Sequence, residues 1–299
     1  MTKTVNGFSK LSKPEKIRWL FEHFAAETKA AERNFAAWQH PDLAVQNVID
    51  GFAENTIANY ALPYSIAPNF LINGKTYAVP MVIEESSVVA AASSAAKFWH
   101  QRGGFHAEVL GTVKLGQVHF YWPGNPSKLR AVFPDLKARL MNSCGDLTAN
   151  MQQRGGGLLD IELIDFEAIE PEYYQLRVSF DTCDSMGANF INSVLERMAG
   201  ALEEFFTLYP SLTDLERDAE VLMSILSNYT PDCLVRVWVE CPIDSFAGLT
   251  RSQGMDASTL AHRFARAVRI AQIDPYRATT HNKGIFNGID AVVLATGND

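Results

Sequence analysis

Apolar residues recur along the first third of the chain at the spacing of helix faces and of a β-hairpin. Residues 13–31 repeat apolar side chains every three or four positions, which predicts an amphipathic helix, and a second helix is predicted over about 43–60. Residues 70–83 hold two apolar runs around Asn73-Gly74, a dipeptide typical of a two-residue hairpin turn. The alanine-rich stretch 88–99 follows two serines that can cap a helix, so we predict a closely packed helix there.

The middle of the chain alternates strands and helices, and the end returns to helix. The predicted elements are a hairpin around Gly116 at 108–122, a helix at 127–153, strands at 158–166 and 174–180, a helix at 186–206, a strand at 234–241, a helix at 257–272, a polar loop and a strand at 291–295. Counted from Gln117, the middle order is β-α-β-β-α-β, a split βαβ arrangement with a mostly antiparallel sheet.

This order predicts an α+β protein with an inserted domain. We expect a larger, mainly helical α/β domain at 1–108 and 227–299, and a smaller ferredoxin-like domain at 109–226. A length of 299 residues is sufficient for one large domain or for two.

Composition narrows the class of function. Apolar residues make up 47% of the chain and charged residues 20%, as in ordinary globular proteins, and a net charge of -8 argues against nucleic acid or an anionic membrane as the main partner. The four cysteines are scattered without metal-ligand spacing, which favours free thiols in a reducing compartment and no metal. The sequence shows neither a signal peptide nor the ~20 apolar residues of a membrane helix, so we expect a cytoplasmic protein.

Four polar segments stand at the ends of predicted elements. Residues 82–87 bring two carboxylates to a helix start, a pattern equally typical of a solvated cap. Residues 184–189 bring small side chains to another helix start, where a phosphate can approach backbone N–H groups, although an ordinary capped helix explains them as well. Residues 274–284 form a long polar loop with two cations, and residues 295–299 end a strand at a carboxylate. Taken one at a time, each has a structural explanation as good as a catalytic one.

Together the segments resemble one family, the hydroxymethylglutaryl-CoA reductases. The matching runs are Glu54-Asn55-Thr56-Ile57, Asn69 to Gly74, Val79-Pro80, Glu84-Glu85, Val88 to Ser93, Asp184 to Asn189, Ile225 to Asn228, Arg277 to Gly288 and Ala295 to Asp299. The His281-Asn282-Lys283-Gly284 run resembles the bacterial, class II branch. The similarity runs in order from about residue 43 to residue 299.

The resemblance implies an NAD- or NADP-dependent oxidoreductase of the mevalonate pathway. Such an enzyme reduces the thioester of hydroxymethylglutaryl-CoA to mevalonate and free CoA with two hydrides, or runs in reverse, and it uses no metal. By motif, Glu85 matches the general acid, Lys283 the cation that stabilises the oxyanion, and Asp299 the aspartate that orients this lysine. The substrate-binding matches are Arg277, Ser87, Asn228 and Asn287, and the cofactor-binding matches are Asp184, Met186, Gly187, Ala188 and Asn189.

The resemblance also implies a homodimer or a higher homo-oligomer with active sites at the subunit interface. Ala58 and Ser86 replace a glycine and a proline that are usual in the family. The family continues beyond the position of Asp299 into a flap domain whose histidine protonates the departing CoA thiolate, and none of the seven histidines here matches it. The alternative is therefore a truncated or split-chain homologue that binds CoA ester and dinucleotide without full turnover.

Overall fold

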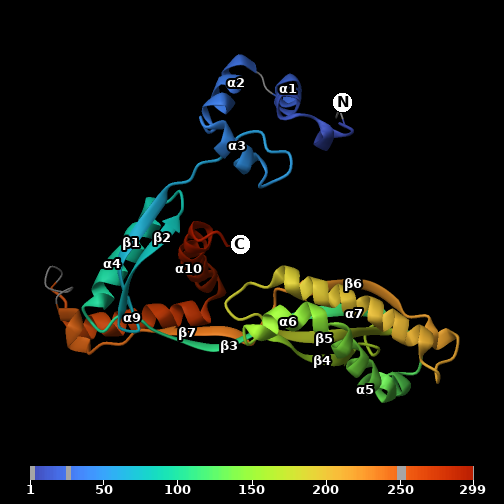
Figure 1. Ribbon diagram of the computed structural model, residues 1–299. Helices are drawn as coiled ribbons and strands as arrows, with labels where there is room; N and C mark the ends of the chain where they lie inside the picture. The colour runs from blue at the N-terminus through green and yellow to red at the C-terminus, as the bar shows by residue number, and fades with distance from the viewer. Residues whose placement is uncertain (1–3, 25–27, 248–253, 299) are drawn as a thin grey trace. The chain divides into compact units, whose positions relative to one another are not determined.

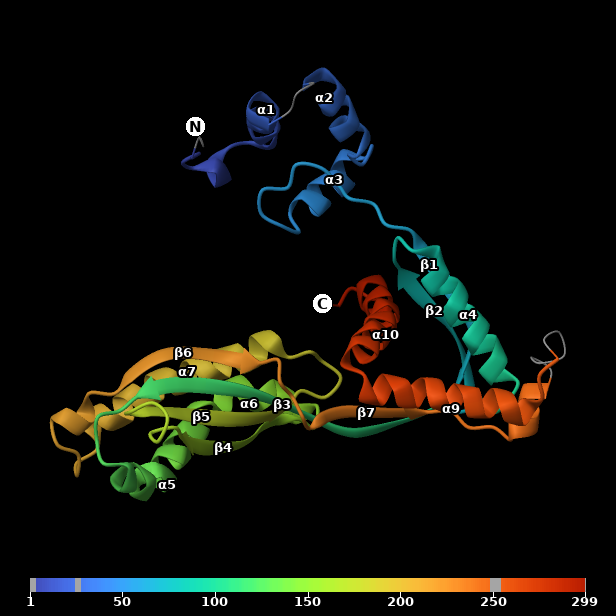
Figure 2. The same cartoon turned by 180° about the vertical axis from the view of Figure 1, so that it is seen from behind.

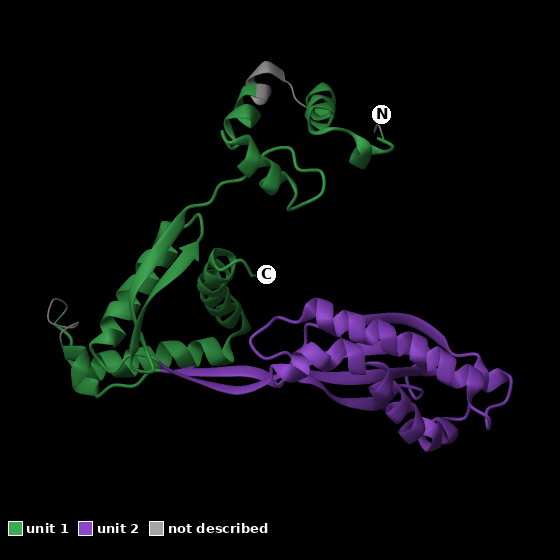
Figure 3. Ribbon diagram, in the orientation of Figure 1, with its two compact units in different colours: residues 1–105, 239–299 green, residues 106–238 purple. Residues whose placement is uncertain are grey.

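The computed structural model describes residues 4–24, 28–247 and 254–298. The chain divides into two compact units, residues 1–105 with 239–299 and residues 106–238, coloured separately in Figure 3. The sequence had suggested an inserted segment at 109–226, whereas the compact unit runs from His106 to Trp238. None of the described helices combines the length and the apolar content that crossing a bilayer requires.

An antiparallel sheet built around one long strand forms unit 106–238. The second half of β3 (His106–Tyr121) pairs with β5 (Tyr173–Asp181) on one side and β6 (Glu220–Ser227) on the other, and β4 (Gly157–Asp165) pairs with β5. The resulting order is β4-β5-β3-β6, while the first half of β3 pairs with β7 (Cys233–Trp238). Strand β6 thus flanks β3 on the side opposite β5, and the sequence analysis did not predict it.

Three helices lie on one face of this sheet, as the two opposite views in Figures 1 and 2 show. They are α5 (Pro126–Ser143), α6 (Gly145–Gln153) and α7 (Ala188–Leu208). The core lies between the layers, and its largest fully buried side chains include Trp122, Tyr174, Phe120, Phe180 and Phe206. The unit therefore has a mixed α/β architecture with one helix-covered sheet face.

The hairpin predicted around Gly116 is wrong, because β3 runs straight through this residue. A Cβ atom at position 116 would lie 2.5 Å from a methyl carbon of Leu195 and 3.1 Å from one of Ile191. The absence of a side chain at Gly116 therefore lets helix α7 pack close to the strand. In the sequence, a glycine needed for close packing looks the same as a glycine needed for a turn.

Three predicted helices are shorter or divided. The predicted helix at 127–153 is two helices that meet at Cys144 and Gly145. The predicted helix at 13–31 corresponds to α1 (Lys13–Phe24) and α2 (Thr28–Ala37), between which residues 25–27 are not described. The predicted helix at 43–60 ends early, as α3 (Leu43–Asp50), where Gly51 follows.

Unit 1–105 with 239–299 contains a hairpin, as Asn73-Gly74 indicated. Strand β1 (Tyr64–Ile72) pairs antiparallel with β2 (Lys75–Val82). Helix α4 (Ser86–His100) follows and contacts β1. The C-terminal part of the unit contains α9 (Ala257–Ile273) and α10 (Pro275–Ala295), the red helix of Figure 1, which contacts β2 and α9. Short 3-10 turns of this unit lie at Phe8–Lys10 and Ile243–Phe246, and a third, Leu215–Arg217, belongs to unit 106–238.

Both the polar loop at 274–284 and the strand at 291–295 were wrong predictions, because one continuous helix, α10, covers these residues. Asp274 accepts hydrogen bonds from the backbone N–H groups of Tyr276 (3.1 Å) and Arg277 (3.3 Å), and Pro275 occupies the first helical position. An acidic N-cap followed by proline is a helix-start signal. The sequence analysis gave this signal too little weight, because glycine and β-branched residues are poor helix formers and α10 contains Gly284, Gly288 and the pair Val292-Val293.

Candidate functional site

The start of α4 brings Glu85 and Ser87 into contact. Glu85 is the extended N-cap residue (φ -102°, ψ 108°), and its carboxylate accepts a hydrogen bond from the Ser87 hydroxyl instead of capping the helix. Both residues are exposed. The helix start thus presents a carboxylate that a neighbouring hydroxyl orients and that a ligand can reach.

Helix α10 carries three of the predicted site residues. Lys283 and Asn287 are four residues apart and therefore share one face of the helix. Arg277 lies six residues before Lys283, about 120° away around the axis. Both cations are exposed, and neither forms an ion pair with a described residue.

One apolar cluster joins these two segments. Ala67 of β1, Met81 of β2 and Ala291 of α10 form its buried centre, with exposures of 0%, 2% and 0%. Ile83 and Val88, on either side of Glu85, pack against this centre. The cluster therefore packs α10 and the start of α4 against the same hairpin.

The described residues include no hydrogen bond or ion pair between Glu85 and Lys283. Lys283 precedes the buried Ala291 by eight residues, about 12 Å along the helix axis at 1.5 Å per residue. Asp299, the third predicted catalytic residue, lies outside the described residues.

An apolar groove of about 440 Å³ runs between α10 and the hairpin. Its lining residues are apolar: Phe70, Val79, Met81, Ala92, Ile285, Gly288, Ile289, Val292 and Val293. Arg277, Lys283 and Asn287 are not among them. This groove is suited to an apolar chain, and it offers no charged group to a phosphate.

The predicted cofactor segment is a turn between β5 and α7. Gly187 is the N-cap of α7 in the left-handed conformation (φ 77°), and no side chain caps the helix. A Cβ atom at position 187 would lie 2.4 Å from Cγ2 of Thr182, so only glycine fits. Asp184, Met186 and Asn189 are exposed, and Ala188 is half-buried at the first helical position.

The buried side of the same turn is held by a compact set of hydrogen bonds. Thr182, 1% exposed, donates its hydroxyl to the main-chain oxygen of Ser185 at 2.7 Å, and the Ser185 hydroxyl donates to the main-chain oxygen of Thr182 at 2.8 Å. The Lys114 ammonium donates to Thr182 Oγ1 and to the Ser185 main-chain oxygen, both at 2.6 Å. The sequence analysis did not predict Lys114 or Thr182 as site residues, because β3 carries other polar side chains and no local pattern marks this lysine.

Asn228, a predicted substrate residue, lies in unit 106–238, where it follows β6 and is exposed. The preceding main chain is fixed to α7, because the N–H of Leu226 donates to the side-chain oxygen of Asn192 at 3.0 Å. The other predicted substrate residues, Arg277, Ser87 and Asn287, belong to the other unit.

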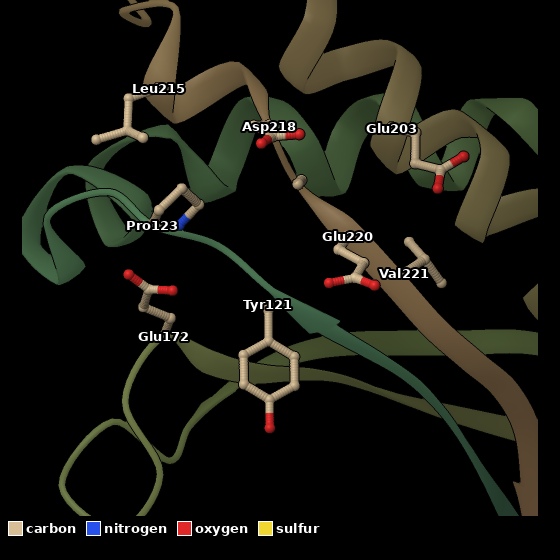
Figure 4. Close-up of a pocket in the computed structure, with 9 residues that line it drawn as sticks. Tyr121, Pro123, Glu172, Glu203, Leu215, Asp218, Glu220 and Val221 are labelled. Atoms are coloured by element: carbon tan, nitrogen blue, oxygen red, sulfur yellow. The ribbon is translucent and has the colours of Figure 1, made fainter.

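Unit 106–238 has a cavity of about 440 Å³ where β3 ends, at Tyr121, and β6 begins, at Glu220 (Figure 4). Four carboxylates line it, from Glu172, Glu203, Asp218 and Glu220. Such a cavity repels the phosphates of a dinucleotide or of CoA, so it is unsuitable as their site. Over the described ranges, no group of three or more His, Cys, Asp or Glu residues is arranged to bind a metal ion.

Comparison with known proteins identifies the family. The sequence profile of hydroxymethylglutaryl-coenzyme A reductase matches residues 16–299. The 3-hydroxy-3-methylglutaryl-coenzyme A reductase of Archaeoglobus fulgidus is 33% identical over 302 residues, covering 100% of this chain and 63% of that protein. A probable 3-hydroxy-3-methylglutaryl-coenzyme A reductase of Borreliella burgdorferi is 32% identical over 303 residues, covering 99% and 64%. The chain thus spans less than two thirds of the length of these curated relatives.

A solved structure gives the same result at the level of the fold. The class II 3-hydroxy-3-methylglutaryl-CoA reductase of Streptococcus pneumoniae, bound to NADPH in open conformations, superposes with a TM-score of 0.72 and 37% sequence identity, over 99% of this chain and 75% of that one. The profile match covers nearly the whole chain, residues 16–299. The chain therefore belongs to the hydroxymethylglutaryl-coenzyme A reductase family.

Proposed function

We propose that the protein is an NAD(P)-dependent oxidoreductase that reduces hydroxymethylglutaryl-CoA to mevalonate and free CoA, or catalyses the reverse oxidation. The observation that carries the proposal is the common apolar cluster of the α4 start and α10. These two elements bear Glu85 and Lys283, the residues that match the family's acid and cation by motif. Family membership over residues 16–299 supports it.

Lys283 would stabilise the negative charge that grows on the thioester oxygen as its carbon is reduced. An ammonium group without an ion-pair partner among the described residues is suited to this task, and loss of one such donor costs about 3–4 kcal/mol of barrier. Glu85 would supply the proton that completes the alcohol, with its carboxyl group oriented by Ser87. Asp299 would hold Lys283 charged and oriented.

Arg277 would bind the free carboxylate of the substrate. Its guanidinium offers two parallel N–H donors to the two oxygens, and the described residues leave it without an ion pair. Asn287, on the Lys283 face of α10, would provide neutral hydrogen bonds to the same substrate. Asn228, exposed after β6, is also proposed as a substrate-binding residue on the strength of the motif match.

The turn at 184–189 fits a nicotinamide dinucleotide. Gly187 leaves the first N–H groups of α7 without a side-chain cap, and Asp184, Met186 and Asn189 are exposed around them. A phosphate suits such a helix start. When bound, NAD(P)H supplies the hydride. Unit 106–238 would thus be the cofactor module, and unit 1–105 with 239–299 the substrate module.

We further propose a homodimer or a higher homo-oligomer with its active sites at the subunit interface, and a cytoplasmic location. The family resemblance supports both. Apolar side chains are exposed on α10, among them Ile285 (50%), Phe286 (63%) and Ile289 (48%), which would favour contact with a second copy.

A spectrophotometric assay tests the proposed activity. The protein is incubated with hydroxymethylglutaryl-CoA and NADH or NADPH, the decrease of dinucleotide absorbance is followed, and mevalonate is identified by mass spectrometry. We expect substrate-dependent oxidation of at least one dinucleotide. Binding of both ligands without oxidation would favour a binding protein, and binding of neither would contradict the proposal.

A further inference from the structure

Lys114 is a charged residue in a row of strand β3 that faces the helices. Residues two positions apart on a strand share a face, and Gly116, Val118 and Phe120 continue this row. Val118 and Phe120 are fully buried, and Gly116 lies against Leu195 of α7. A lysine in such a row is costly unless its ammonium group finds acceptors.

The Lys114 ammonium finds these acceptors in the turn before α7. It donates to the Thr182 hydroxyl oxygen and to the Ser185 main-chain oxygen, each at 2.6 Å, and no described carboxylate forms an ion pair with it. Bonds from a charged donor are about twice as strong as those between neutral groups. Lys114 therefore joins the central strand to two points of this turn.

The same turn presents other side chains outward. The Thr182 hydroxyl and the Ser185 main-chain oxygen receive the Lys114 bonds, whereas Asp184 and Met186, on either side of Ser185, are exposed. The left-handed Gly187 then starts α7 in contact with Thr182. Without the lysine, Thr182 Oγ1 and the Ser185 carbonyl would lose their shared donor, and the turn could relax.

We infer that Lys114 is a positioning residue of the dinucleotide site: through Thr182 and Ser185 it fixes the 184–189 turn in its ligand-binding shape before the dinucleotide arrives. The inference rests on the proposed function, since it concerns the cofactor segment. A turn that is ordered in the free protein spares the ligand the entropy cost of ordering it, which raises affinity.

The test compares dinucleotide affinity in matched lysine variants. K114M removes the ammonium group and keeps an unbranched apolar side chain of similar length. K137M makes the same change at a lysine of α5 in the same unit, whose ammonium group pairs with Asp160. We expect K114M to raise the Kd of NADPH or NADH about tenfold, K137M to leave it unchanged, and neither to change the affinity for hydroxymethylglutaryl-CoA.

Thr182→Val separates positioning from direct contact between Lys114 and the ligand. The substitution removes the hydroxyl group that receives the Lys114 bond and that itself donates to the Ser185 main-chain oxygen, so it should also weaken dinucleotide binding. In the double variant K114M/T182V the loss of affinity should be smaller than the sum of the two single losses, because both changes break the Lys114–Thr182 bond. K114R, which keeps the charge and the donors, should bind more tightly than K114M. T182V also serves as the test if K114M does not fold.

Two results overturn the inference: wild-type affinity in K114M, or wild-type affinity in T182V together with weakened binding in K114M. Failure of the proposed function gives a different result, because the unmodified protein would then bind neither NADH nor NADPH. Titration calorimetry at one salt concentration, with thermal melts of every variant, distinguishes these outcomes.

Discussion

Trp122 donates its indole N–H to the main-chain oxygen of Glu216 at 2.6 Å, and both residues are buried. The Glu216 carboxylate in turn accepts from the Lys128 ammonium and, at 2.8 Å, from the backbone N–H of Thr213. This one glutamate therefore joins the loop after α7 to the start of α5 and to the centre of the core.

Acid should weaken this connection. The Lys128 ammonium, together with the Thr213 N–H, lowers the pKa of Glu216 from 4.5 to about 2. A lowered folded-state pKa gives stability that is fully present above 4.5 and is lost as the pH falls towards 2. We expect wild-type stability, measured by urea unfolding, to fall more steeply between these values than that of Glu216→Gln. Asp214→Asn, at an exposed carboxylate of the same loop, is the control and should keep the wild-type slope.

Gly116→Ala should destabilise the protein by about 1–3 kcal/mol, the usual range for overpacking a core. The added methyl would meet Leu195 at 2.5 Å. Gly200→Ala on α7 is the matched control, since a Cβ there meets nothing within 4 Å and alanine favours a helix by about 1 kcal/mol. Equal unfolding free energies for the two variants would contradict the packing explanation for Gly116.

Gly187→Ala should impair both folding of the turn and dinucleotide binding. Gly155→Ala provides the comparison, because Gly155 also has positive φ (94°) but a Cβ there meets nothing within 4 Å. Both variants bear about 1–2 kcal/mol of left-handed strain. Only Gly187→Ala adds the 2.4 Å contact with Thr182, so its melting temperature should be the lower of the two. The reverse order would show that the close contact is relieved elsewhere.

Elements whose conformation depends on a few neighbouring residues, such as the β1–β2 turn, were predicted from the sequence. Asn73-Gly74 specifies the β1–β2 turn by itself, and Asn73 does adopt positive φ (48°). Gly116 shows where local prediction fails. A glycine is needed there because of the Leu195 side chain of α7, almost eighty positions away, and no local stretch of sequence contains both residues. For α10, the helix-start signal of Asp274-Pro275 was present, but the glycines and β-branched residues that follow outweighed it.

The site shows the same division. The motif matches predicted Glu85, Lys283 and Arg277 through resemblance, and the structure adds the Ser87–Glu85 hydrogen bond and the packing of α10 on the hairpin. Lys114 was not identified, because nothing local distinguishes it from a surface lysine. Its partners Thr182 and Ser185 follow about seventy positions later, and only the antiparallel pairing of β3 with β5 brings them near.

Cys144 should be the slow thiol of the four. It is fully buried and burial raises the pKa of its thiol, whereas the other three cysteines are partly exposed. Since the thiolate is the reactive form, a disulfide reagent should modify three thiols in a fast phase and the fourth only as the protein opens. Cys144→Ala should remove the slow phase and leave the fast amplitude unchanged. A fast phase of four thiols would contradict this assignment.

Lys283→Met should lower kcat for thioester reduction by about 100- to 1,000-fold, the usual effect of losing one oxyanion donor. Because Lys283 is exposed on α10, away from the buried Ala291 contact, the melting temperature should change little. KM for hydroxymethylglutaryl-CoA should also change little, since the charge that Lys283 stabilises develops mainly in the transition state. Lys97→Met, at an exposed lysine of α4, is the control and should retain full activity. A Lys283→Met protein with near wild-type kcat would exclude this lysine from the chemistry, whereas a raised KM at unchanged kcat would assign it to substrate binding alone.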